Sequence, residues 1–421
     1  MDSTFISWDQ IAAALPAVQA DALVQLATTA MTYDTTLYIV GGAARSVFQQ
    51  HPITDLDIAI SRTSPEIVHA LADTIGGQVT HHDQFATATI RMPPSHAFPT
   101  IDVIPTRQEQ YAHPGALPTV TPTDIVTDLA RRDISVNAIA IAVVPHGRCP
   151  VYDPFDGIGD LRRRVARLLH AASCVDDPTR IIRMARIAVR LNLRIPQQSV
   201  AAVARARQSH AIARVSAHRW LHELLKTLAE PDPGRVLARL QRWGVLTAIH
   251  PALRYKRAMH TCLPHIPQQH RLAVMVWHAT PTDLAALLRT WHELPASMRQ
   301  IPPLKRVIST WRTHPVERPS HIASLLRPFE SALSASIALI DPTLARMYTI
   351  WQQAITHTPP MHVSGADLVA AGLAPGPDIG AYLAQLRDAL LDGRVDATTH
   401  TAQLTWLLAH PPTSHLHRQL L

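Results

Sequence analysis

The sequence has few cysteines, almost no lysine and no long apolar run. Its 421 residues include three cysteines, Cys149, Cys174 and Cys262, with no CxxC spacing among them. This excludes a disulfide-rich scaffold and is typical of a reducing cytoplasm. No apolar stretch approaches the ~18 residues that cross a bilayer, and the N-terminus lacks the basic and apolar regions of a signal peptide. We therefore expect a cytoplasmic protein with no membrane span.

Lysine occurs only at Lys226, Lys256 and Lys305, so nearly all of the positive charge is arginine. Lys plus Arg is 39 and Asp plus Glu is 32, which gives a formal net charge of +7. A basic chain suits phosphate-rich partners such as nucleic acid. A gene whose base composition favours arginine codons would give the same surplus. The positions of particular arginines are therefore more informative than their number.

Hydrophobic periodicity predicts an α+β protein with a small mixed sheet near the N-terminus and helices after it. We expect strands over residues 37–40, 55–60, 87–92 and 100–104, a helix over 65–75, and a strand or helix over 135–144. Later helices are expected over residues 177–193, 200–207, 217–228, 234–243, 272–278, 380–391 and 399–408. The expected domains are a helical segment over 1–35, a catalytic head over 36–160, a helical neck over 161–230, and a helical body and tail over 231–421.

The first motif joins a strand to a helix through Gly41 and Gly42, with Arg45 one turn later. Glycines there let backbone N–H groups approach an anion, and the start of a helix adds positive potential. Arg45 can add a charge-assisted contact to a phosphate. A Gly-Gly pair alone can also be a plain turn. The order of strand, glycines and helix favours a nucleotide-binding site at Gly41, Gly42 and Arg45.

An Asp-x-Asp pair follows at Asp55 and Asp57, which we expect on one strand with both carboxylates on one face. Asp102, on another expected strand, can supply a third acid. Neighbouring carboxylates repel unless a cation lies between them, and hard oxygen ligands suit Mg²⁺. A lone Asp-x-Asp is also common on a solvated strand face. Close to the glycine motif, the three acids predict a catalytic centre in which Asp55 and Asp57 bind Mg²⁺.

A second motif, residues 128–138, holds Arg131, Arg132, Asp133 and Asn137. Two guanidinium groups, an acid and an amide can together bind phosphate and ribose hydroxyls. The alternative is a salt-bridged helix end. We expect Arg132 and Asp133 in the nucleotide site.

A third motif starts a helix at Asp177-Pro178 and continues with Arg180, Arg183 and Arg186 at three-residue spacing. We expect these four charged residues to form a ridge along roughly one helix face. Asp accepts hydrogen bonds and Arg donates them, which complements the Watson–Crick edges of cytosine and adenine and not those of guanine and uracil. The alternative is a capping aspartate with a solvated arginine face.

Together these motifs resemble those of class II tRNA nucleotidyltransferases, the CCA-adding enzymes, and of the related bacterial poly(A) polymerases. Other similar segments follow in the family's order: a loop-like segment at 111–118, a hinge-like one at 153–161, a neck-bracing one at 216–223 and a tail-like one at 364–393. The chain departs from the family at Ser46, where Asp is usual, which puts an Asp-anchored Arg45 in doubt. It also departs at Ile134-Ser135, where Phe-Thr is usual, and at Asp176, where Glu is common.

The resemblance implies a polymerase-beta-like nucleotidyltransferase head followed by an all-α neck, body and tail. It also implies addition of CCA, or part of it, to the 3′ end of tRNA from CTP and ATP, by two-metal transfer without a nucleic-acid template. In this scheme Gly42 and Arg45 contact the triphosphate, Arg132 and Asp133 lie near the ribose, and Asp177 and Arg180 read the base. Arg183 and Arg186 also belong to the nucleotide site, where they support the triphosphate or the template ridge, and the helical half holds the acceptor stem.

Several alternatives stay open at this point. A poly(A) polymerase, a CC-adding enzyme or an A-adding enzyme shares the same core motifs. A non-catalytic RNA-binding protein on the same scaffold is a different class, against which the intact Asp55 and Asp57 argue. A metal-dependent phosphohydrolase is a third class, suggested by the segment 81–83 and by His260, Cys262, His265 and His270. No HExxH motif or matching helical His and Asp set supports it, so surface histidines are the better interpretation.

Overall fold

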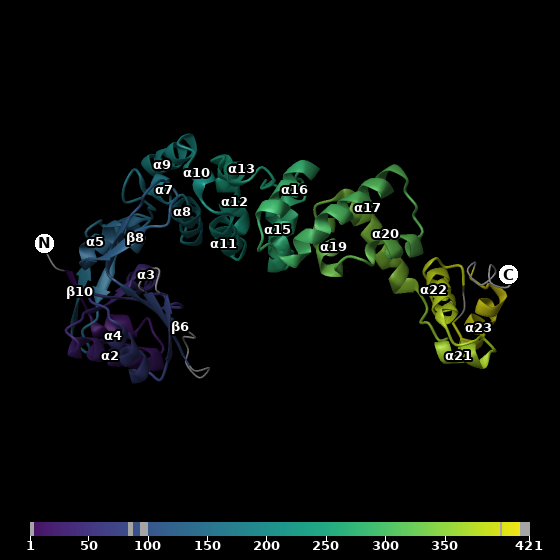
Figure 1. Ribbon diagram of the computed structural model, residues 1–421, viewed down its shortest axis with the longest axis horizontal. Helices are drawn as coiled ribbons and strands as arrows, with labels where there is room; N and C mark the ends of the chain where they lie inside the picture. Colours follow the sequence, from purple (N-terminus) through teal and green to yellow (C-terminus); the bar gives the residue numbers. More distant parts are fainter. Residues whose placement is uncertain (1–3, 83–86, 93–99, 396–397, 413–421) are drawn as a thin grey trace. The chain divides into compact units, whose positions relative to one another are not determined.

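The computed structural model describes residues 4–82, 87–92, 100–395 and 398–412 (Figure 1). The chain forms two compact units, Met1–Ile249 and His250–Leu421. Within the described residues, strands occur only in the first unit, in the purple-to-blue part of the ribbon. No helix in this described part is long and apolar enough to cross a membrane. The α+β class and the order of sheet before helices are therefore as predicted.

An eight-stranded sheet is the centre of the first unit. Its strands are, from edge to edge, β1 (Thr4–Ser7), β10 (Arg148–Tyr152), β9 (Ala140–Ala142), β2 (Leu37–Val40), β3 (Asp57–Ile60), β6 (Thr100–Pro105), β5 (Thr87–Arg91) and β4 (Gln78–His82). Neighbouring strands are antiparallel except β3 and β6, which are parallel and pair Asp57 with Asp102. The sheet thus brings together two acids that lie far apart in the sequence.

The two faces of this sheet differ because successive strand residues point to opposite sides. The larger apolar layer takes Ile58 and Ile60 of β3 and packs against α2 (Ala17–Thr32), α3 (Gly41–Gln49) and α4 (Pro65–Thr74). The smaller layer takes Ala59 and packs against α5 (Ile125–Ala130). By the same alternation, Asp57 and Asp102 lie on the face of the smaller layer. The larger layer therefore stabilises the sheet and leaves the other face for chemistry.

Local sequence signals place the helices of this layer. Pro65 stands at the start of α4, and the Ser64 Oγ accepts a hydrogen bond of 3.3 Å from the Ile67 backbone N–H. Such an N-cap stabilises the helix by about 1 kcal/mol.

Two sequence predictions about the first unit need correction. The segment 1–35 is not purely helical, because β1 precedes α1 (Trp8–Ala12) and α2 and pairs with β10. Strand β3 begins at Asp57, so Asp55 lies in the bend before it and not on the strand.

A separate hairpin and a tight junction follow the sheet. Strands β7 (Arg107–Gln110) and β8 (Thr119–Pro122) pair with each other, and the loop-like segment 111–118 connects them. The hinge-like segment forms α6 (Gly157–Arg162), whose first N–H groups are bound by the Asp153 carboxylate at 2.6 and 2.9 Å. A Cβ at Gly157 would lie 2.2 Å from the Ser135 carbonyl oxygen, so only glycine fits this junction. The 135–144 segment is a short 3₁₀ turn (Ser135–Asn137) followed by β9.

Helices complete the first unit. They are α7 (Ser173–Asp176), α8 (Thr179–Arg190), α9 (Gln197–Gln208), α10 (Ala211–Arg214), α11 (Ala217–Leu228), α12 (Pro233–Arg242) and α13 (Val245–Ile249). Helix α8 packs against α11 and α12 through fully buried residues such as Met184, Leu224 and Leu240. Truncating one such residue to alanine typically costs about 2–5 kcal/mol. Apolar burial therefore fixes α8, which carries the third motif.

The second unit is helical throughout its described residues. Its helices are α14 (Met259–Cys262), α15 (Gln268–Val276), α16 (Pro281–Thr290), α17 (Ile301–Thr313), α18 (Pro319–Leu326), α19 (Ser331–Ala338), α20 (Pro342–His357), α21 (Gly365–Ala370), α22 (Pro377–Leu391) and α23 (His400–Ala409), with 3₁₀ turns at Leu263–His265 and Ala296–Gln300. In the tail-like segment, Ser364 and Asp367 form a capping box at the start of α21. The predicted boundaries at 35, 160 and 230 stay predictions.

Candidate active site

A cavity of about 380 Å³ in the first unit collects residues from all three sequence motifs. It is lined by Val40, Gly41, Gly42, Asp57, Ile104, Arg107, Glu109, Tyr111, Pro118, Arg131, Arg132, Asp133, Asn137, Asp177, Arg180 and Arg183. Residues more than a hundred positions apart in the sequence therefore share one site. Four predicted residues, Arg45, Asp55, Asp102 and Arg186, are not part of the lining.

The glycine motif forms one wall of this cavity. Helix α3 begins at Gly41, whose φ of +63° lies in the left-handed region that favours glycine. A Cβ on Gly41 would lie 3.2 Å from the Arg132 Nη1 and 3.8 Å from the Asp57 Oδ2. The bare backbone thus lets an arginine and a carboxylate approach the start of a helix, where backbone N–H groups can bind an anion.

Arg45 lies behind this wall and not in it. Its buried guanidinium donates a hydrogen bond from Nη1 to the Asn137 Oδ1, and its Nη2 lies 3.6 Å from where a Cβ on Gly42 would be. Burial lowers the pKa of Arg45, and the positive charge of Arg190 lowers it further. The amide of Asn137 therefore anchors Arg45 in this chain, in which Ser46 replaces the family's aspartate.

The acids gather beside the glycines. Asp57 and Asp102 are register partners on β3 and β6, and the Thr89 Oγ1 donates to the Asp102 Oδ1 at 2.8 Å. Burial raises the pKa of Asp57, the charge of Asp102 raises it further, and Asp55 adds to this effect, while Arg132 opposes it. Three carboxylates therefore repel one another at one place on the sheet.

This repulsion is what a bound cation would relieve, so the acids fit a divalent metal ion. No group of three or more His, Cys, Asp or Glu side chains among the described residues is arranged to hold a metal by itself. Mg²⁺ does not need such a cage, because it usually binds one or two carboxylates together with water and substrate phosphates. Asp55 and Asp57 can supply those carboxylates, and the backbone at Gly41 and Gly42 leaves room for the phosphates.

The second motif supplies two fixed guanidinium groups. The buried carboxylate of Asp128 accepts hydrogen bonds from Arg131 at 2.6 Å and from Arg132 at 3.0 Å. Burial alone would raise the pKa of Asp128, but the two arginines bring it below its usual value. The second motif is therefore a salt-bridged helix end in which Asp128 orients both arginines that line the cavity.

Asp133 connects the second motif to α8. Its side chain is buried, and it accepts hydrogen bonds from the Ile134 backbone N–H at 2.8 Å and the Asn137 Nδ2 at 3.2 Å. The Arg183 Nε lies 3.2 Å from its other carboxylate oxygen. Burial alone would raise the pKa of Asp133, but Arg183 together with the hydrogen bonds from Ile134 and Asn137 brings it below its usual value.

Asp177 and Arg180 are also held in place by hydrogen bonds. The Arg219 Nη2 donates to the Asp177 Oδ1 at 2.7 Å, and the Arg219 Nη1 donates to the Gly115 carbonyl oxygen at 3.1 Å. Arg180 donates to the Arg131 carbonyl oxygen at 2.7 Å, the Ser173 Oγ at 3.0 Å and the Tyr111 hydroxyl at 3.2 Å. Among the described residues no hydrogen bond reaches the Asp177 Oδ2, so this oxygen can accept one from a ligand.

Known proteins match most of this chain. Residues 37–167 match the family profile described as the poly(A) polymerase head domain, and residues 192–256 match a profile described as a probable RNA- and SrmB-binding site of polymerase A. The CC-adding tRNA nucleotidyltransferase of Deinococcus radiodurans is 32% identical over 386 residues, which are 90% of this chain and 91% of that protein. The chain belongs to the tRNA nucleotidyltransferase family.

Other similar proteins of this family differ in length and activity. The A-adding tRNA nucleotidyltransferase of Halalkalibacterium halodurans is 35% identical over 258 residues, and this chain spans only 59% of its length. A solved CCA-adding enzyme of Thermotoga maritima, in complex with tRNA, matches with a TM-score of 0.74 and 22% identity, covering 97% of this chain and 99% of that one. This likeness confirms the predicted nucleotidyltransferase fold of the chain.

Arg186 lies outside the cavity lining for a geometric reason. Residues three apart on a helix are rotated by about 300°, so each step of the ridge drifts by about 60°. Asp177 lies before α8 in an extended conformation, and Arg186 is rotated by about 120° around α8 from Arg180. It donates to Glu223 at 3.0 Å and to Glu230 at 2.9 Å, in the contact of α8 with α11 and the turn after it. In this tRNA nucleotidyltransferase family member, Arg186 braces the helix and does not line the cavity.

Sequence reasoning missed Arg107 and Glu109, which line the cavity from β7. Glu109 is buried and binds the Arg131 Nη1 and the Tyr111 hydroxyl, both at 2.8 Å, while Arg180 lies 3.7 Å away. One signal for them was available. Arg107, Glu109 and Tyr111 alternate along an extended segment, which puts all three side chains on one face of a strand.

Proposed function

We propose that this family member adds nucleotides to the 3′ end of tRNA from CTP and ATP, and that it depends on Mg²⁺. The observation that carries the proposal is the single cavity lined by Gly41, Asp57, Arg132, Asp177 and Arg180. Its carboxylates suit a metal ion, its glycine turn and arginines suit a triphosphate, and its acid–arginine pair suits a base. The product is CCA or a part of it.

In the proposed reaction the terminal 3′-hydroxyl of tRNA attacks the α-phosphate of CTP or ATP. A new phosphodiester bond forms, the bond to the pyrophosphate breaks, and the hydroxyl proton goes to solvent. Asp55 and Asp57 would hold Mg²⁺, which would supply a Lewis acid to lower the pKa of the hydroxyl and neutralise phosphate charge. Arg131 and Arg132, held by Asp128, offset the charge that develops on the leaving pyrophosphate.

Asp55→Ala tests the metal assignment. We expect a fall in turnover of about 10³-fold or more, because metal stabilisation of transition-state charge is worth several kcal/mol. Binding of tRNA is expected to stay within about twofold of the unmodified protein, measured by filter binding. Asp73→Ala removes the same charge from an exposed position on α4 and is expected to leave turnover unchanged. Normal turnover in Asp55→Ala would refute the assignment.

Base selection in this proposal depends on Asp177 and Arg180. Asp177 accepts a hydrogen bond from the amino group of the base, and Arg180 donates one to the ring nitrogen. Cytosine and adenine both present this pair of groups. The contacts of both side chains to Arg219, Ser173 and Tyr111 hold them in one orientation before a nucleotide binds. Guanine and uracil present the reverse pattern and would leave these groups unpaired, which is costly in a desolvated site.

Arg180→Ala tests this selection. We expect discrimination of CTP and ATP from GTP and UTP to fall about tenfold to a hundredfold, since one hydrogen bond to a charged group contributes about 1.5–3 kcal/mol. The measurement is kcat/KM for each of the four triphosphates. Arg194→Ala removes an exposed arginine a few residues beyond α8 and should keep the discrimination. If both variants discriminate equally well, Arg180 does not read the base.

A second candidate activity is CC addition alone, because the Deinococcus radiodurans relative that matches 90% of this chain is a CC-adding enzyme. A-adding and poly(A)-polymerising activities share the same core. One assay separates the four: purified protein is given tRNA ending at the discriminator base, at C or at CC, with labelled CTP and ATP. Incorporation of both nucleotides into the first substrate, stopping after three additions, identifies a CCA-adding enzyme.

A further inference from the structure

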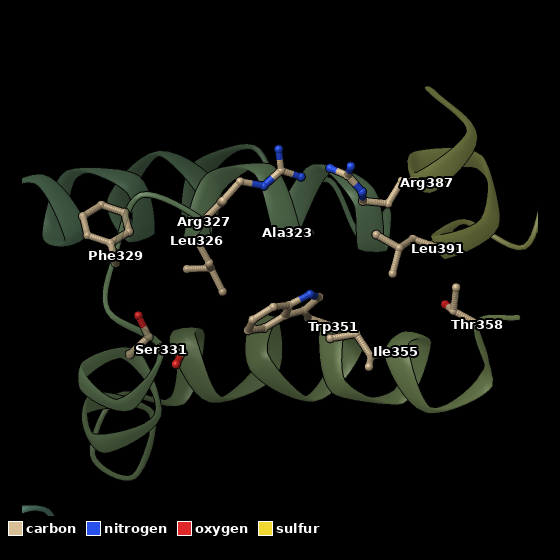
Figure 2. A pocket seen from close by; sticks show the side chains of 11 residues that line it. Ala323, Leu326, Arg327, Phe329, Ser331, Trp351, Ile355, Thr358, Arg387 and Leu391 are labelled. Carbon is tan, nitrogen blue, oxygen red and sulfur yellow. The ribbon is translucent and has the colours of Figure 1, made fainter. Parts of the chain in front are cut away.

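A cavity of about 520 Å³ lies in the second unit, between helices α18, α20 and α22 (Figure 2). Its apolar lining includes Leu326, Trp351, Ile355 and Leu391. Figure 2 shows the indole of Trp351 projecting from α20 toward α18 and Leu326. Ile355 is 45% exposed, so this apolar surface is open to solvent and not filled by the chain's described residues. An apolar hollow of this size can hold the body of a small organic molecule.

The charged side chains of the lining are all positive. Arg327 and Arg387 are exposed, and Figure 2 shows both guanidinium groups near α18, on the opposite side of the cavity from Trp351. No acidic residue is part of the lining, and neither guanidinium group has a hydrogen bond or ion pair with another described residue. Two unpaired guanidinium groups beside an apolar surface fit a molecule with an acidic head.

A buried polar group adds an independent observation. Ser334 lines the same cavity and is only 1% exposed, and its hydroxyl oxygen has no hydrogen-bond partner among the described residues. A buried hydroxyl without a partner is destabilising, and such groups are rare in folded proteins. A ligand supplies the missing partner once the side chains that cover this oxygen shift to admit it.

A second cavity in this unit, of about 850 Å³, shows the contrast. Its Lys305 already donates to the Ala279 carbonyl oxygen at 2.6 Å, and its Arg312 donates to the Thr343 Oγ1 at 3.1 Å. Lys305 and Arg312 connect helices in this way, whereas Arg306 of that lining, like Arg327 and Arg387, has no side-chain partner among the described residues.

We propose that the cavity at Trp351 binds a small organic anion that combines one acidic head group with an apolar body, such as an aromatic sulfonate or a medium-chain carboxylate. The head pairs with Arg327 and Arg387, and the body packs on Trp351, Leu326 and Leu391. The Ser334 hydroxyl bonds to the ligand. This site lies apart in sequence from all residues proposed for nucleotide addition, and it does not rest on that proposal.

Fluorescence titration of the full chain with anilinonaphthalene sulfonate tests the proposal, because this dye has the required head and body and brightens in apolar surroundings. We expect saturable binding at one site. Arg327→Ala with Arg387→Ala is expected to raise Kd about tenfold, as the loss of charge-assisted contacts predicts. Arg289→Ala with Arg299→Ala removes the same charge elsewhere in the unit and should leave Kd unchanged. Equal Kd values in the two double variants, or no binding to the unmodified chain up to millimolar dye, would overturn the proposal.

Competition experiments identify the ligand class. Decanoate should displace the dye, whereas inorganic phosphate, which has the charge without the apolar body, should not. Displacement by phosphate at the same concentration as decanoate would overturn the assignment. Displacement by tRNA, with the same dependence on Arg327 and Arg387, would show an RNA contact surface and also overturn it.

Ser334→Ala separates a ligand contact from a structural role. Removal of an unpaired buried hydroxyl should raise the Tm of the free protein slightly, whereas loss of its contact should weaken dye binding about threefold. A purely structural role of Ser334 would change the Tm and the dye affinity in the same direction. A higher Tm with unchanged dye affinity would remove Ser334 from the site.

Discussion

At the scale of single residues, Gly41 carries the sharpest prediction. Gly41→Ala forces a Cβ into a left-handed backbone at φ +63° and within 3.2 Å of the Arg132 Nη1. We expect a loss of about 1–2 kcal/mol in unfolding free energy from the backbone strain. We also expect kcat/KM for nucleotide addition to fall at least about tenfold, because Arg132 must move. Chemical denaturation and steady-state kinetics measure the two effects.

Gly76→Ala is the matched control for this prediction. Gly76 has a similar φ of +68°, at the turn after α4, but a Cβ there would meet no atom within 4 Å. The unfolding free energy of the Gly76→Ala variant should fall by a similar amount, while its kcat/KM stays unchanged. If the two variants lose the same activity, the close approach at Gly41 has no catalytic meaning.

Residue identity predicted some of the site and not all of it. Gly41, Asp57, Arg132, Asp177 and Arg180 were predicted because each stands in a short motif whose chemistry is visible in sequence. Glu109 was missed because its role exists only once β7 brings it beside Arg131, a contact between residues far apart in the chain. Asp55 was expected on a strand, and the two-residue delay in the start of β3 put it in a bend.

At the scale of elements, the buried carboxylate of Glu230 links two successive turns of α8. It accepts hydrogen bonds from the Arg186 Nε and the Arg190 Nε, both at 2.9 Å. Glu230→Gln removes the charge and keeps the shape, so we expect unfolding free energy to fall by about 2 kcal/mol, less than for a fully buried pair because Arg190 is half-exposed. Thermal and urea unfolding of the full chain measure this loss.

The stability difference between the unmodified protein and Glu230→Gln should depend on pH in a definite direction. Burial alone would raise the pKa of Glu230, but Arg190 and Arg186 bring it below the ordinary value of 4.5. The carboxylate's contribution is therefore complete above that pH and is lost as the pH falls through the lower folded pKa. The gap between the unmodified protein and Glu230→Gln should thus close in acid. Glu317→Gln, in an exposed pair with Arg346, should cost less than about 1 kcal/mol at any pH.

Helices and strands were unequally predictable from the sequence. Helices with capping or proline signals, such as α4 and α11, lie where periodicity put them, the latter at Ala217–Leu228 as expected. The first strand, β1, gave no signal because four residues are too short for a period of two to be read, and its partner β10 is far away in sequence. Whether such a segment becomes a strand depends on pairing with a distant segment, and the local pattern of a single sequence does not show which segment that is.

For the whole molecule, the arginine surplus has two explanations that salt can separate. If the net charge of +7 serves phosphate contacts, binding of tRNA must release counterions, so log Kd should rise linearly with log salt. About six phosphate contacts would weaken binding about 10³-fold between 50 and 200 mM KCl at fixed Mg²⁺. Sucrose at matched osmolarity is the control and should change nothing. A flat dependence would contradict the phosphate-binding explanation and leave the surplus as a consequence of codon composition.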